Sequence, residues 1–278
     1  MFMGLVGSEM CIRDRLEMNM DLGISGKWAI VCASSKGLGF GCAKALAVEG
    51  VNVVINSRSE ESLEKAENSI RAISDSEVMR VVGDVTTKEG QDKILKACSN
   101  PDILVTNAGG PPPGLWSDWD REDFIKAIDA NMLTPISLIQ AVLPQMMSKG
   151  WGRIVNITSQ SVKAPIAVLG LSNSARAGLT GFVAGTARQV AGTGVTINNL
   201  MPGIHATDRA VALDTGVSIA QKITIEEAKA QRFKDIPAGR YGTADEFGAT
   251  CAFLCSKHSG FIIGQNILLD GGAVNATL

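Results

Sequence analysis

Short apolar runs alternate with longer segments of helical periodicity from Lys27 to the end of the chain. A short apolar run bounded by polar or turn residues is typical of a strand that is buried on both faces of a parallel sheet. Seven such runs occur, at 28–33 (WAIVCA), 51–56 (VNVVIN), 78–82 (VMRVV), 102–107 (DILVTN), 153–158 (RIVNIT), 195–200 (VTINNL) and 266–270 (NILLD).

The segments between these runs predict helices near 38–49, 60–74, 87–98, 120–148, 172–191 and 244–256. Alternating strands and helices form βαβ units with right-handed crossovers. We therefore expect an α/β fold of the Rossmann type: a doubly wound, seven-stranded parallel sheet with helices on both faces. Because the sequence carries no internal repeat or linker, residues 20–278 are predicted to form one domain.

The segment 204–236 breaks this alternation between the sixth strand and the last helix. It includes most of TIEEAKAQRFKDIP (224–237), whose amphipathic pattern predicts a further helix. An insertion at the carboxyl edge of a parallel sheet is expected to form a lid or a substrate wall; an ordinary surface excursion is the alternative.

The first 19 residues do not fit the pattern of the rest. VGSEMCIRDR (6–15) has no apolar period and no helix cap. We interpret residues 1–19 as a non-native or disordered extension and place the natural start at Met20, with a genuine N-terminal arm as the alternative.

Composition narrows the class of ligand. The 278-residue chain is 45% hydrophobic and carries 26 Lys and Arg against 28 Asp and Glu, for a net charge of -2. This balance gives no electrostatic basis for binding nucleic acid or an anionic membrane, so a small-molecule ligand is expected. The six cysteines form no CxxC pair, and no apolar run reaches the length of a membrane span. We expect a cytoplasmic protein without a disulfide framework or a metal site.

A glycine cluster follows the first predicted strand directly. Gly37, Gly39 and Gly41 open a helix in CASSKGLGFGCAKALA (32–47). Such a turn lets backbone N–H groups approach a pyrophosphate at the helix N-terminus, although a plain strand-to-helix turn is the alternative.

The cofactor is predicted from two basic residues. Arg58 stands at the end of the second strand, where an NAD-selective site places an acidic residue. Arg58 and Lys36 flank one pocket and are expected to hold a 2′-phosphate, so we prefer NADP(H) over NAD(H); the alternative is that both are solvated surface charges.

With these motifs the chain resembles the short-chain dehydrogenase/reductase family, in the branch of the 3-oxoacyl-(acyl-carrier-protein) reductases. CASSKGLG (32–39) matches the family's TGxxxGxG, GDV (83–85) its adenine contact, and TNAGG (106–110) its NNAG, while ILLDGG (267–272) closes the chain as in the family. Ala33 replaces the first glycine of the first motif, which requires a φ below zero there. The resemblance implies cofactor contacts at Ala33, Ser35, Lys36, Gly37, Leu38, Gly39, Arg58, Asp84, Val85, Asn107, Ala108, Gly109, Arg176, Pro202, Gly203 and Thr207.

The catalytic signature departs from the family. The family has Ser, then Tyr thirteen residues later and Lys four residues after that; from Ser159 this spacing reaches Ser172 and Arg176. The only tyrosine of the chain, Tyr241, lies far from this segment. The resemblance therefore implies a modified tetrad of Asn131, Ser159, Ser172 and Arg176.

The substitution removes the proton donor. A phenol beside a lysine cation has a pKa below about 10, whereas a serine hydroxyl is a far weaker acid. Arg176 keeps the positive charge one helical turn from Ser172 and is expected to bind the nicotinamide ribose. Lys163 and His205 are the candidate replacement donors, with a surface lysine and a structural histidine as the alternatives.

Two other motifs bear on the function and the shape of the site. GLSNS (170–174) superficially resembles the GxSxG of serine hydrolases, but the last glycine is missing and no strand precedes it. GGPPPG (109–114) is expected to form a stiff loop over the nicotinamide pocket, and Trp116 and Trp119 either line that pocket or pack in the core.

These observations predict an NADP(H)-dependent oxidoreductase acting on CH–OH or C=O groups. It is expected to reduce a 3-oxoacyl-like or other ketone, or to oxidise the corresponding alcohol. The alternative is a catalytically silent nucleotide-binding homologue that acts as a sensor or an oligomer subunit. The resemblance also implies a homotetramer or homodimer with 261–272 at an interface.

Overall fold

The core of the molecule is a parallel sheet of seven strands. The computed structural model describes residues 20–276, so the interpretation of residues 1–19 lies outside it. The sheet order β3-β2-β1-β4-β5-β6-β7 is that of a doubly wound fold, as predicted. The strands are β1 (Trp28–Val31), β2 (Asn52–Ser57), β3 (Val78–Val82), β4 (Ile103–Thr106), β5 (Gly152–Ile157), β6 (Val195–Pro202) and β7 (Asn266–Leu269).

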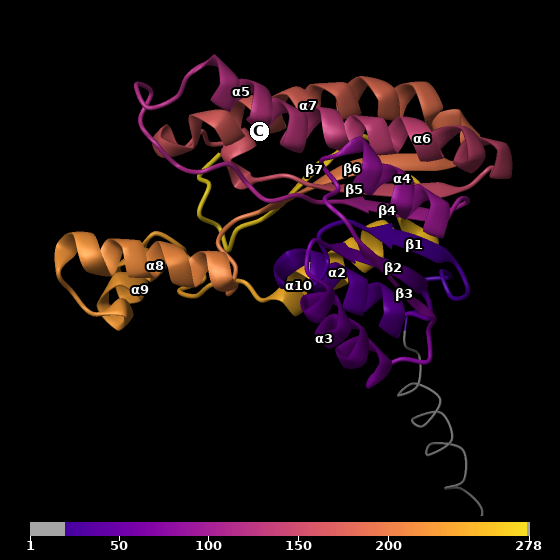
Figure 1. Cartoon of the computed structure of the whole chain (residues 1–278), viewed down its shortest axis with the longest axis horizontal. Helices are drawn as coiled ribbons and strands as arrows, with labels where there is room; N and C mark the ends of the chain where they lie inside the picture. The colour runs from indigo at the N-terminus through magenta and orange to yellow at the C-terminus, as the bar shows by residue number, and fades with distance from the viewer. Residues whose placement is uncertain (1–19, 277–278) are drawn as a thin grey trace, which may run out of the picture.

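Helices cover both faces of this sheet (Figure 1). Successive strand residues point to opposite faces. Accordingly, Ala29 and Val31 of β1 belong to one apolar cluster, and Ile30 belongs to the other. The first cluster is closed by α2 (Gly37–Val48), α3 (Glu60–Arg71) and α10 (Ala244–Leu254), and the second by α4 (Lys88–Ala97), α6 (Thr134–Lys149) and α7 (Gly170–Val190).

The helix expected over 120–148 is interrupted. It is split into α5 (Arg121–Ile128), a π-helical turn (Asp129–Leu133) and α6. Pro135 explains the break, because it has no N–H to donate to the carbonyl of Asn131 four residues earlier. The wider turn places Asn131 in the interior, and π-turns of this kind occur often at functional sites.

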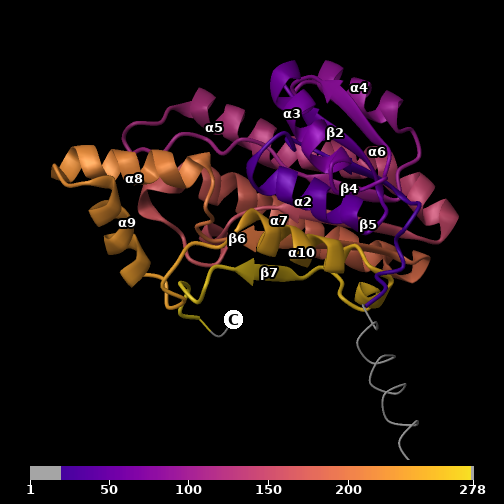
Figure 2. The same ribbon diagram turned by 90° about the horizontal axis from the view of Figure 1, so that it is seen from below.

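The insertion at 204–236 forms a pair of helices, α8 (Asp208–Gln221) and α9 (Ile225–Lys234), that projects from the body (Figures 1 and 2). The structure confirms the predicted helix, which begins at a capping box between Thr224 and Glu227. α8 was not predicted. The two helices are joined through the buried Asp214 carboxylate of α8, which accepts hydrogen bonds from Arg232 Nε at 2.9 Å and Tyr241 Oη at 2.7 Å.

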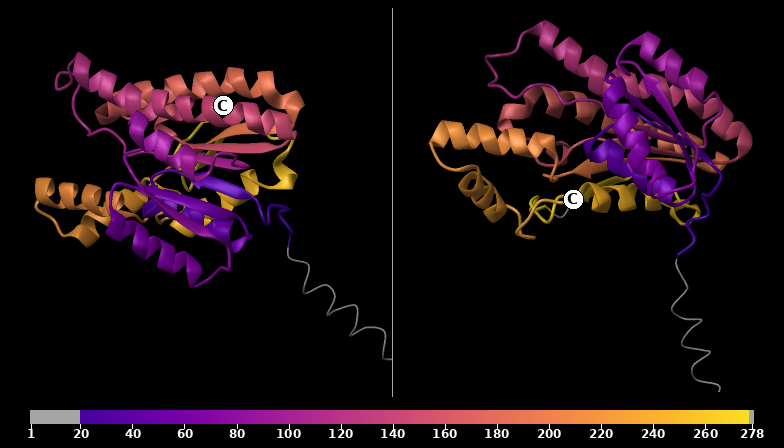
Figure 3. Two further views of the ribbon diagram at one scale, coloured as in Figure 1. Left: turned by 45° about the vertical axis from the view of Figure 1, so that its right-hand side comes forward. Right: turned by 60° about the horizontal axis from the view of Figure 1, so that its bottom comes forward.

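Figure 3 shows that the projecting pair lies beyond one edge of the sheet, away from the strands' starting ends. Strands of a parallel sheet all end at the same edge. Short connections at that edge include the 3-10 turns η2 (Gln160–Val162) and η3 (Ala167–Leu169) after β5. No helix within residues 20–276 is long and apolar enough to cross a membrane.

The backbone at Ala33 contradicts the sequence expectation. Ala33 has a φ of 46°, in the left-handed region, rather than a φ below zero. The conformation turns its carbonyl toward Asn107, whose Nδ2 donates to it at 3.2 Å. A residue with a Cβ is strained in this region by about 1–2 kcal/mol, so the position still favours the glycine that the family motif carries.

Replacing Ala33 by glycine is therefore expected to stabilise the protein. The relief of strain exceeds the extra entropy of an unfolded glycine, so the free energy of unfolding should rise by about 0.5–1 kcal/mol. Urea denaturation followed by circular dichroism measures it. Gly37→Ala is the matched control, because Gly37 has a φ of 62° and should lose stability when a Cβ is added. A free energy of unfolding lower for Ala33→Gly than for the wild-type protein would contradict the strain at Ala33.

Candidate active site

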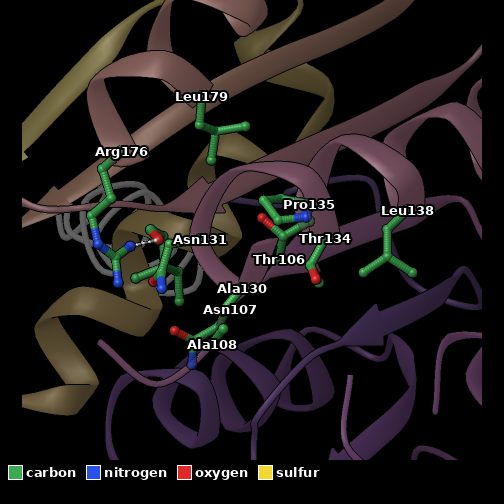
Figure 4. Close-up of a pocket in the computed structure, with 11 residues that line it drawn as sticks. Thr106, Asn107, Ala108, Ala130, Asn131, Thr134, Pro135, Leu138, Arg176 and Leu179 are labelled. Atoms are coloured by element: carbon green, nitrogen blue, oxygen red, sulfur yellow. Dashed lines mark hydrogen bonds between the residues drawn. The ribbon is translucent and has the colours of Figure 1, made fainter. Parts of the chain in front are cut away.

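A pocket lies at the carboxyl edge of the sheet, beside the point where the strand order reverses between β1 and β4. Ligands of doubly wound folds bind at this position. Its lining comes from β4 and the loop after it, the π-turn, α6, the end of β5 and α7 (Figure 4). The lining residues are Thr106, Asn107, Ala108, Ala130, Asn131, Thr134, Pro135, Leu138, Ile157, Arg176 and Leu179.

Two of the four tetrad residues are in direct contact. Arg176 Nε donates to Ser172 Oγ at 3.2 Å, and Arg176 Nη1 donates to the Ile157 carbonyl at 2.9 Å. The first bond follows from their spacing of four along α7, which puts both on one face. Both residues are buried, Ser172 being 4% and Arg176 8% exposed. Ser172 is thus held as a hydroxyl beside a fixed cation.

The Arg176 guanidinium keeps its charge at neutral pH. Burial and, to a smaller extent, the charge of Arg209 together lower the pKa of Arg176 to about 10. Both effects disfavour the charged form. At pH 7 the group nevertheless remains protonated, so the pocket contains a permanent positive charge.

Asn131 contributes a polar atom without a partner. Its Nδ2 donates to the Ala127 carbonyl at 3.4 Å, while Oδ1 is buried and accepts no hydrogen bond within residues 20–276. Ser159 stands at the start of η2, where its hydroxyl accepts from the Ser161 N–H at 3.1 Å. A buried amide oxygen without a donor marks a place for water or a ligand group.

The candidate replacement donors lie elsewhere. The His205 ring packs edge-on against Phe247, with ring centroids 5.3 Å apart, and its Nδ1 lies 3.3 Å from the Gly203 carbonyl. Burial lowers the pKa of His205, so it is neutral at pH 7. Lys163 is exposed at the end of η2. The structure places neither side chain in the pocket lining.

The Tyr241 hydroxyl forms a structural hydrogen bond. Its hydroxyl donates to Asp214, and burial together with that carboxylate raises the pKa of Tyr241 to about 12. It therefore does not replace the missing phenol. Ser172 likewise has no histidine partner in the described part of the chain, which removes the geometric basis of a serine hydrolase.

The glycine loop has the form expected of a phosphate site. α2 begins after Lys36 without any side-chain cap, so its first N–H groups are available to an anion. A Cβ on Gly39 would lie 2.4 Å from the Ala33 carbonyl oxygen, so no larger residue fits there. Gly41 serves a different purpose: a Cβ would lie 2.2 Å from the Ala244 oxygen, where α2 packs closely on α10.

The two predicted 2′-phosphate ligands are exposed and paired. Arg58 lies 3.8 Å from the Asp84 carboxylate, with 81% of its side chain exposed. Lys36 forms an ion pair of 2.7 Å with Asp208, the first residue of α8. Asp84 is also held by Thr86, whose N–H and hydroxyl lower the pKa of the carboxyl group. Both cations remain accessible, since surface pairs of this kind are weak.

The other predicted residues lie at the same edge in different roles. Val85 is core, and Pro202 ends β6. The Gly203 N–H donates to the Leu269 carbonyl at 2.7 Å, and Thr207 precedes α8.

Trp119 packs against Gly170 at the start of α7, whereas Trp116 is 88% exposed. The loop 109–114 is joined to η3 by a hydrogen bond from the Gly114 N–H to the Val168 carbonyl at 3.0 Å.

Sequence reasoning missed Arg209, although it expected the insertion 204–236 to form a lid or a substrate wall. Arg209, the second residue of α8, lies over Gly110 of the loop after β4: a Cβ on that glycine would be 2.5 Å from Arg209 Nη1. A second hollow opens between η2 and α9, and Arg232 and Ile236 of the insertion line it together with Gln160, the neighbour of Ser159. No sequence motif marks Arg209; its place two residues after Thr207 was the available signal.

Comparison with known proteins decides the family. A family model described as Enoyl-(Acyl carrier protein) reductase matches residues 32–274. The chain belongs to the short-chain dehydrogenase/reductase family. The 3-oxoacyl-(acyl-carrier-protein) reductase FabG of Haemophilus influenzae is 32% identical over 255 residues, which cover 90% of this chain and 98% of the relative.

Further members of the short-chain dehydrogenase/reductase family are similar over the same length. The NADPH-dependent reductase BacG of Bacillus subtilis is 30% identical over 258 residues, covering 91% of this chain and all of the relative (100%). The structure of L-sorbose reductase from Gluconobacter frateurii, complexed with NADPH and L-sorbose, has a TM-score of 0.88 at 25% identity and covers 92% of this chain and 100% of that chain. The predicted fold and family are both confirmed, and the chain is a member of an oxidoreductase family.

Proposed function

We propose that this protein is an NADP(H)-dependent oxidoreductase that reduces a ketone, 3-oxoacyl-like or other, or oxidises the corresponding alcohol. The observation that carries the proposal is the Ser172–Arg176 pair. A buried hydroxyl and a permanent cation stand together at the carboxyl edge of the sheet, across the loop after β4 from the glycine turn. In the family's pattern these positions belong to the catalytic Tyr and Lys.

The residues present fit a nicotinamide dinucleotide phosphate. The uncapped start of α2 suits the pyrophosphate, and Gly39 leaves no room for a side chain there. Arg58 and Lys36 are accessible for the 2′-phosphate, and exchange of their surface carboxylate partners for a phosphate costs little. BacG is named as an NADPH-dependent reductase and the sorbose reductase structure is complexed with NADPH, and both support the same choice.

A nicotinamide cofactor held by these residues would supply the hydride for the carbonyl carbon. The Ser172 and Ser159 hydroxyls are the groups that hydrogen-bond the carbonyl oxygen, and Arg176 stabilises the negative charge that develops on it. Ser172 donates only its hydrogen bond, because its pKa is too high for it to give up the proton. We assign that proton to water, and the lack of a general acid is expected to lower the rate by about 10² to 10⁴.

A silent nucleotide-binding protein is the second candidate. The packing of His205 against Phe247 and the exposure of Lys163 favour it, because within residues 20–276 neither side chain forms a hydrogen bond with Ser172 or Arg176. A protein of this kind binds the cofactor and acts as a sensor or as a subunit of an oligomer.

One paired measurement separates the candidates. Titration with NADPH followed by its fluorescence reports binding, and loss of absorbance on a panel of 3-oxoacyl thioesters, diketones and quinones reports turnover. We expect micromolar binding and slow turnover of at least one substrate class. Binding without turnover on every substrate supports the silent protein, and the absence of nucleotide binding would reject both.

A further inference from the structure

The hollow between η2 and α9 is large enough to hold the body of a small substrate. Its volume is about 260 Å³, whereas the pocket beside Asn131 and Arg176 measures about 10 Å³. The smaller pocket has room for one water molecule, which takes up about 10–15 Å³. A substrate therefore fits the larger hollow and not the smaller pocket. The hollow is lined by Gln160, Ile204, Arg232, Asp235, Ile236 and Ala273.

This hollow begins beside a hydroxyl of the tetrad. Gln160 is the first residue of η2 and follows Ser159 directly, so their Cα atoms are about 3.8 Å apart. Ile204, on another side of the hollow, comes two residues after the end of β6. A substrate whose carbonyl meets the Ser159 hydroxyl therefore places the atoms next to that carbonyl beside Gln160.

The Gln160 side chain brings a buried acceptor without a partner to this lining. Within residues 20–276, six buried side-chain polar atoms form no hydrogen bond, and Gln160 Oε1 is the one whose residue lines the hollow. Gly203 makes room for it, since a Cβ on that glycine would lie 3.0 Å from Gln160 Oε1. A buried amide oxygen is costly to leave unpaired, so we expect a ligand to supply its donor.

The wall formed by α9 offers donors without a net positive charge. Arg232 Nε donates to the buried Asp214 carboxylate at 2.9 Å, and this carboxylate neutralises the guanidinium. A guanidinium has five N–H donors, so others remain for a ligand in the hollow that Arg232 lines. Asp235 adds a second carboxylate to the lining. The hollow therefore presents donors and acceptors but does not attract an anion.

We propose that the substrate is a neutral polyhydroxylated ketone, or the polyol formed from it, whose hydroxyl groups bind Gln160 and Arg232. The inference rests on the proposed function and adds the substrate class. A hydroxyl both donates and accepts, so neighbouring hydroxyls can satisfy the Gln160 oxygen, the Arg232 fork and the Asp235 carboxylate together. Ile204 and Ile236 supply apolar surface for the C–H groups of such a chain.

A 3-oxoacyl thioester and an oxo acid match this lining less well. The nearest N–H group of a thioester's carrier arm lies beyond the sulfur, so a methylene group would face Gln160 and leave its oxygen unpaired. Sites built to hydrogen-bond a hydroxyl strongly reject an analogue that lacks it, because the site's polar groups then stay unpaired. The carboxylate of an oxo acid would meet Asp235, which carries the same charge.

The experiment uses the full chain saturated with NADPH, which cannot oxidise an alcohol, so ligands bind without turnover. Isothermal titration calorimetry compares D-glucitol, D-mannitol and galactitol with 2-hexanol and with the N-acetylcysteamine thioester of 3-hydroxybutyrate. Hexitols are chosen because, unlike ketoses, they do not close into rings. We expect at least one hexitol to bind about tenfold or more tightly than 2-hexanol, as one or two added hydrogen bonds predict.

Two results of this titration would overturn the inference. In the first, no hexitol reaches that ratio over 2-hexanol. In the second, the thioester binds more tightly than all of the hexitols, which would assign the hollow to an acyl carrier arm. A chain that binds no NADPH fails the proposed function instead, so the two failures are distinguishable.

Variants of Gln160 then assign the contact. Gln160→Met keeps the length of the side chain and removes the amide, so it should weaken the hexitol about tenfold and leave 2-hexanol within about twofold. Gln231→Met is the matched control, because it makes the same chemical change on an exposed side chain of α9 outside the lining. Hexitol binding that Gln160→Met leaves unchanged, or that falls only in step with 2-hexanol, would refute the assignment.

Arg232→Lys tests the opposite wall and decides the matter if Gln160→Met does not fold. Lysine keeps a positive charge beside Asp214 but lacks the planar fork that reaches a second acceptor. Hexitol binding should fall about threefold or more, while NADPH and 2-hexanol binding stay within about twofold. A folded, NADPH-binding Arg232→Lys chain with wild-type affinity for the hexitol would overturn the inference.

Discussion

Replacing Ser172 by tyrosine and Arg176 by lysine together is expected to raise kcat for ketone reduction by about 10² to 10⁴-fold. The pair restores a phenol whose pKa a neighbouring ammonium lowers into the working range. The backbone is already in place, because Ser172 and Arg176 are held on one face of α7, 3.2 Å apart. Lysine is shorter than arginine, so the exchange also frees part of the volume that the ring needs. Steady-state kinetics on the best substrate of the wild-type protein measures the gain.

The control for this experiment is Ser172→Phe with Arg176→Lys. It carries the same ring and the same cation but no hydroxyl, so it separates proton donation from packing. In the tyrosine variant, the reduction rate should fall as pH rises through the phenol's pKa, because only the protonated phenol donates. The phenylalanine variant lacks that step in its profile. A folded, NADPH-binding tyrosine variant that is no faster than wild type would show that proton supply does not limit the reaction.

The fold was predictable because its signals are local and repeated. The central strands are buried on both faces, so Val53–Ile55 and Ile103–Val105 form apolar runs that are recognisable without any tertiary information. The phosphate loop was predictable for a similar reason: Gly39 is required by a backbone contact with Ala33, six residues earlier in the chain. Patterns that arise from contacts within one βαβ unit can therefore be recognised in the sequence alone.

Features that depend on distant contacts were not predictable. α8 has no apolar stripe, since it projects from the body and buries only Ala210 and Asp214, so periodicity gave no sign of it. Asp214 meets Arg232 and Tyr241 from 18 and 27 residues away, and no motif links the three. The positive φ of Ala33 was wrongly excluded, because the hydrogen bond that Asn107 donates to its carbonyl is a tertiary contact. His205 was a reasonable candidate by type, but its packing on Phe247 is visible only in three dimensions.

Replacing Arg58 by aspartate is expected to weaken NADPH by about 10² and to leave NADH within a few-fold. The variant removes a charge-assisted contact to the 2′-phosphate, worth about 1.5–3 kcal/mol, and adds repulsion from the new carboxylate. The ribose 2′-hydroxyl of NADH, by contrast, gains an acceptor. Arg58 is 81% exposed beside Asp84, so the change leaves the core intact. Fluorescence titration with both nucleotides measures the ratio.

Arg121→Asp is the matched control for that ratio. Arg121 is 83% exposed and pairs with Glu122 at the start of α5, so its replacement makes the same change in net charge away from the glycine turn. The control should leave both nucleotide affinities within about twofold, because exposed charges beyond a Debye length of about 10 Å are screened. Equal weakening of NADPH and NADH by Arg58→Asp would place the 2′-phosphate elsewhere. In that case Lys36, released from Asp208, is the remaining ligand on that side of the pocket.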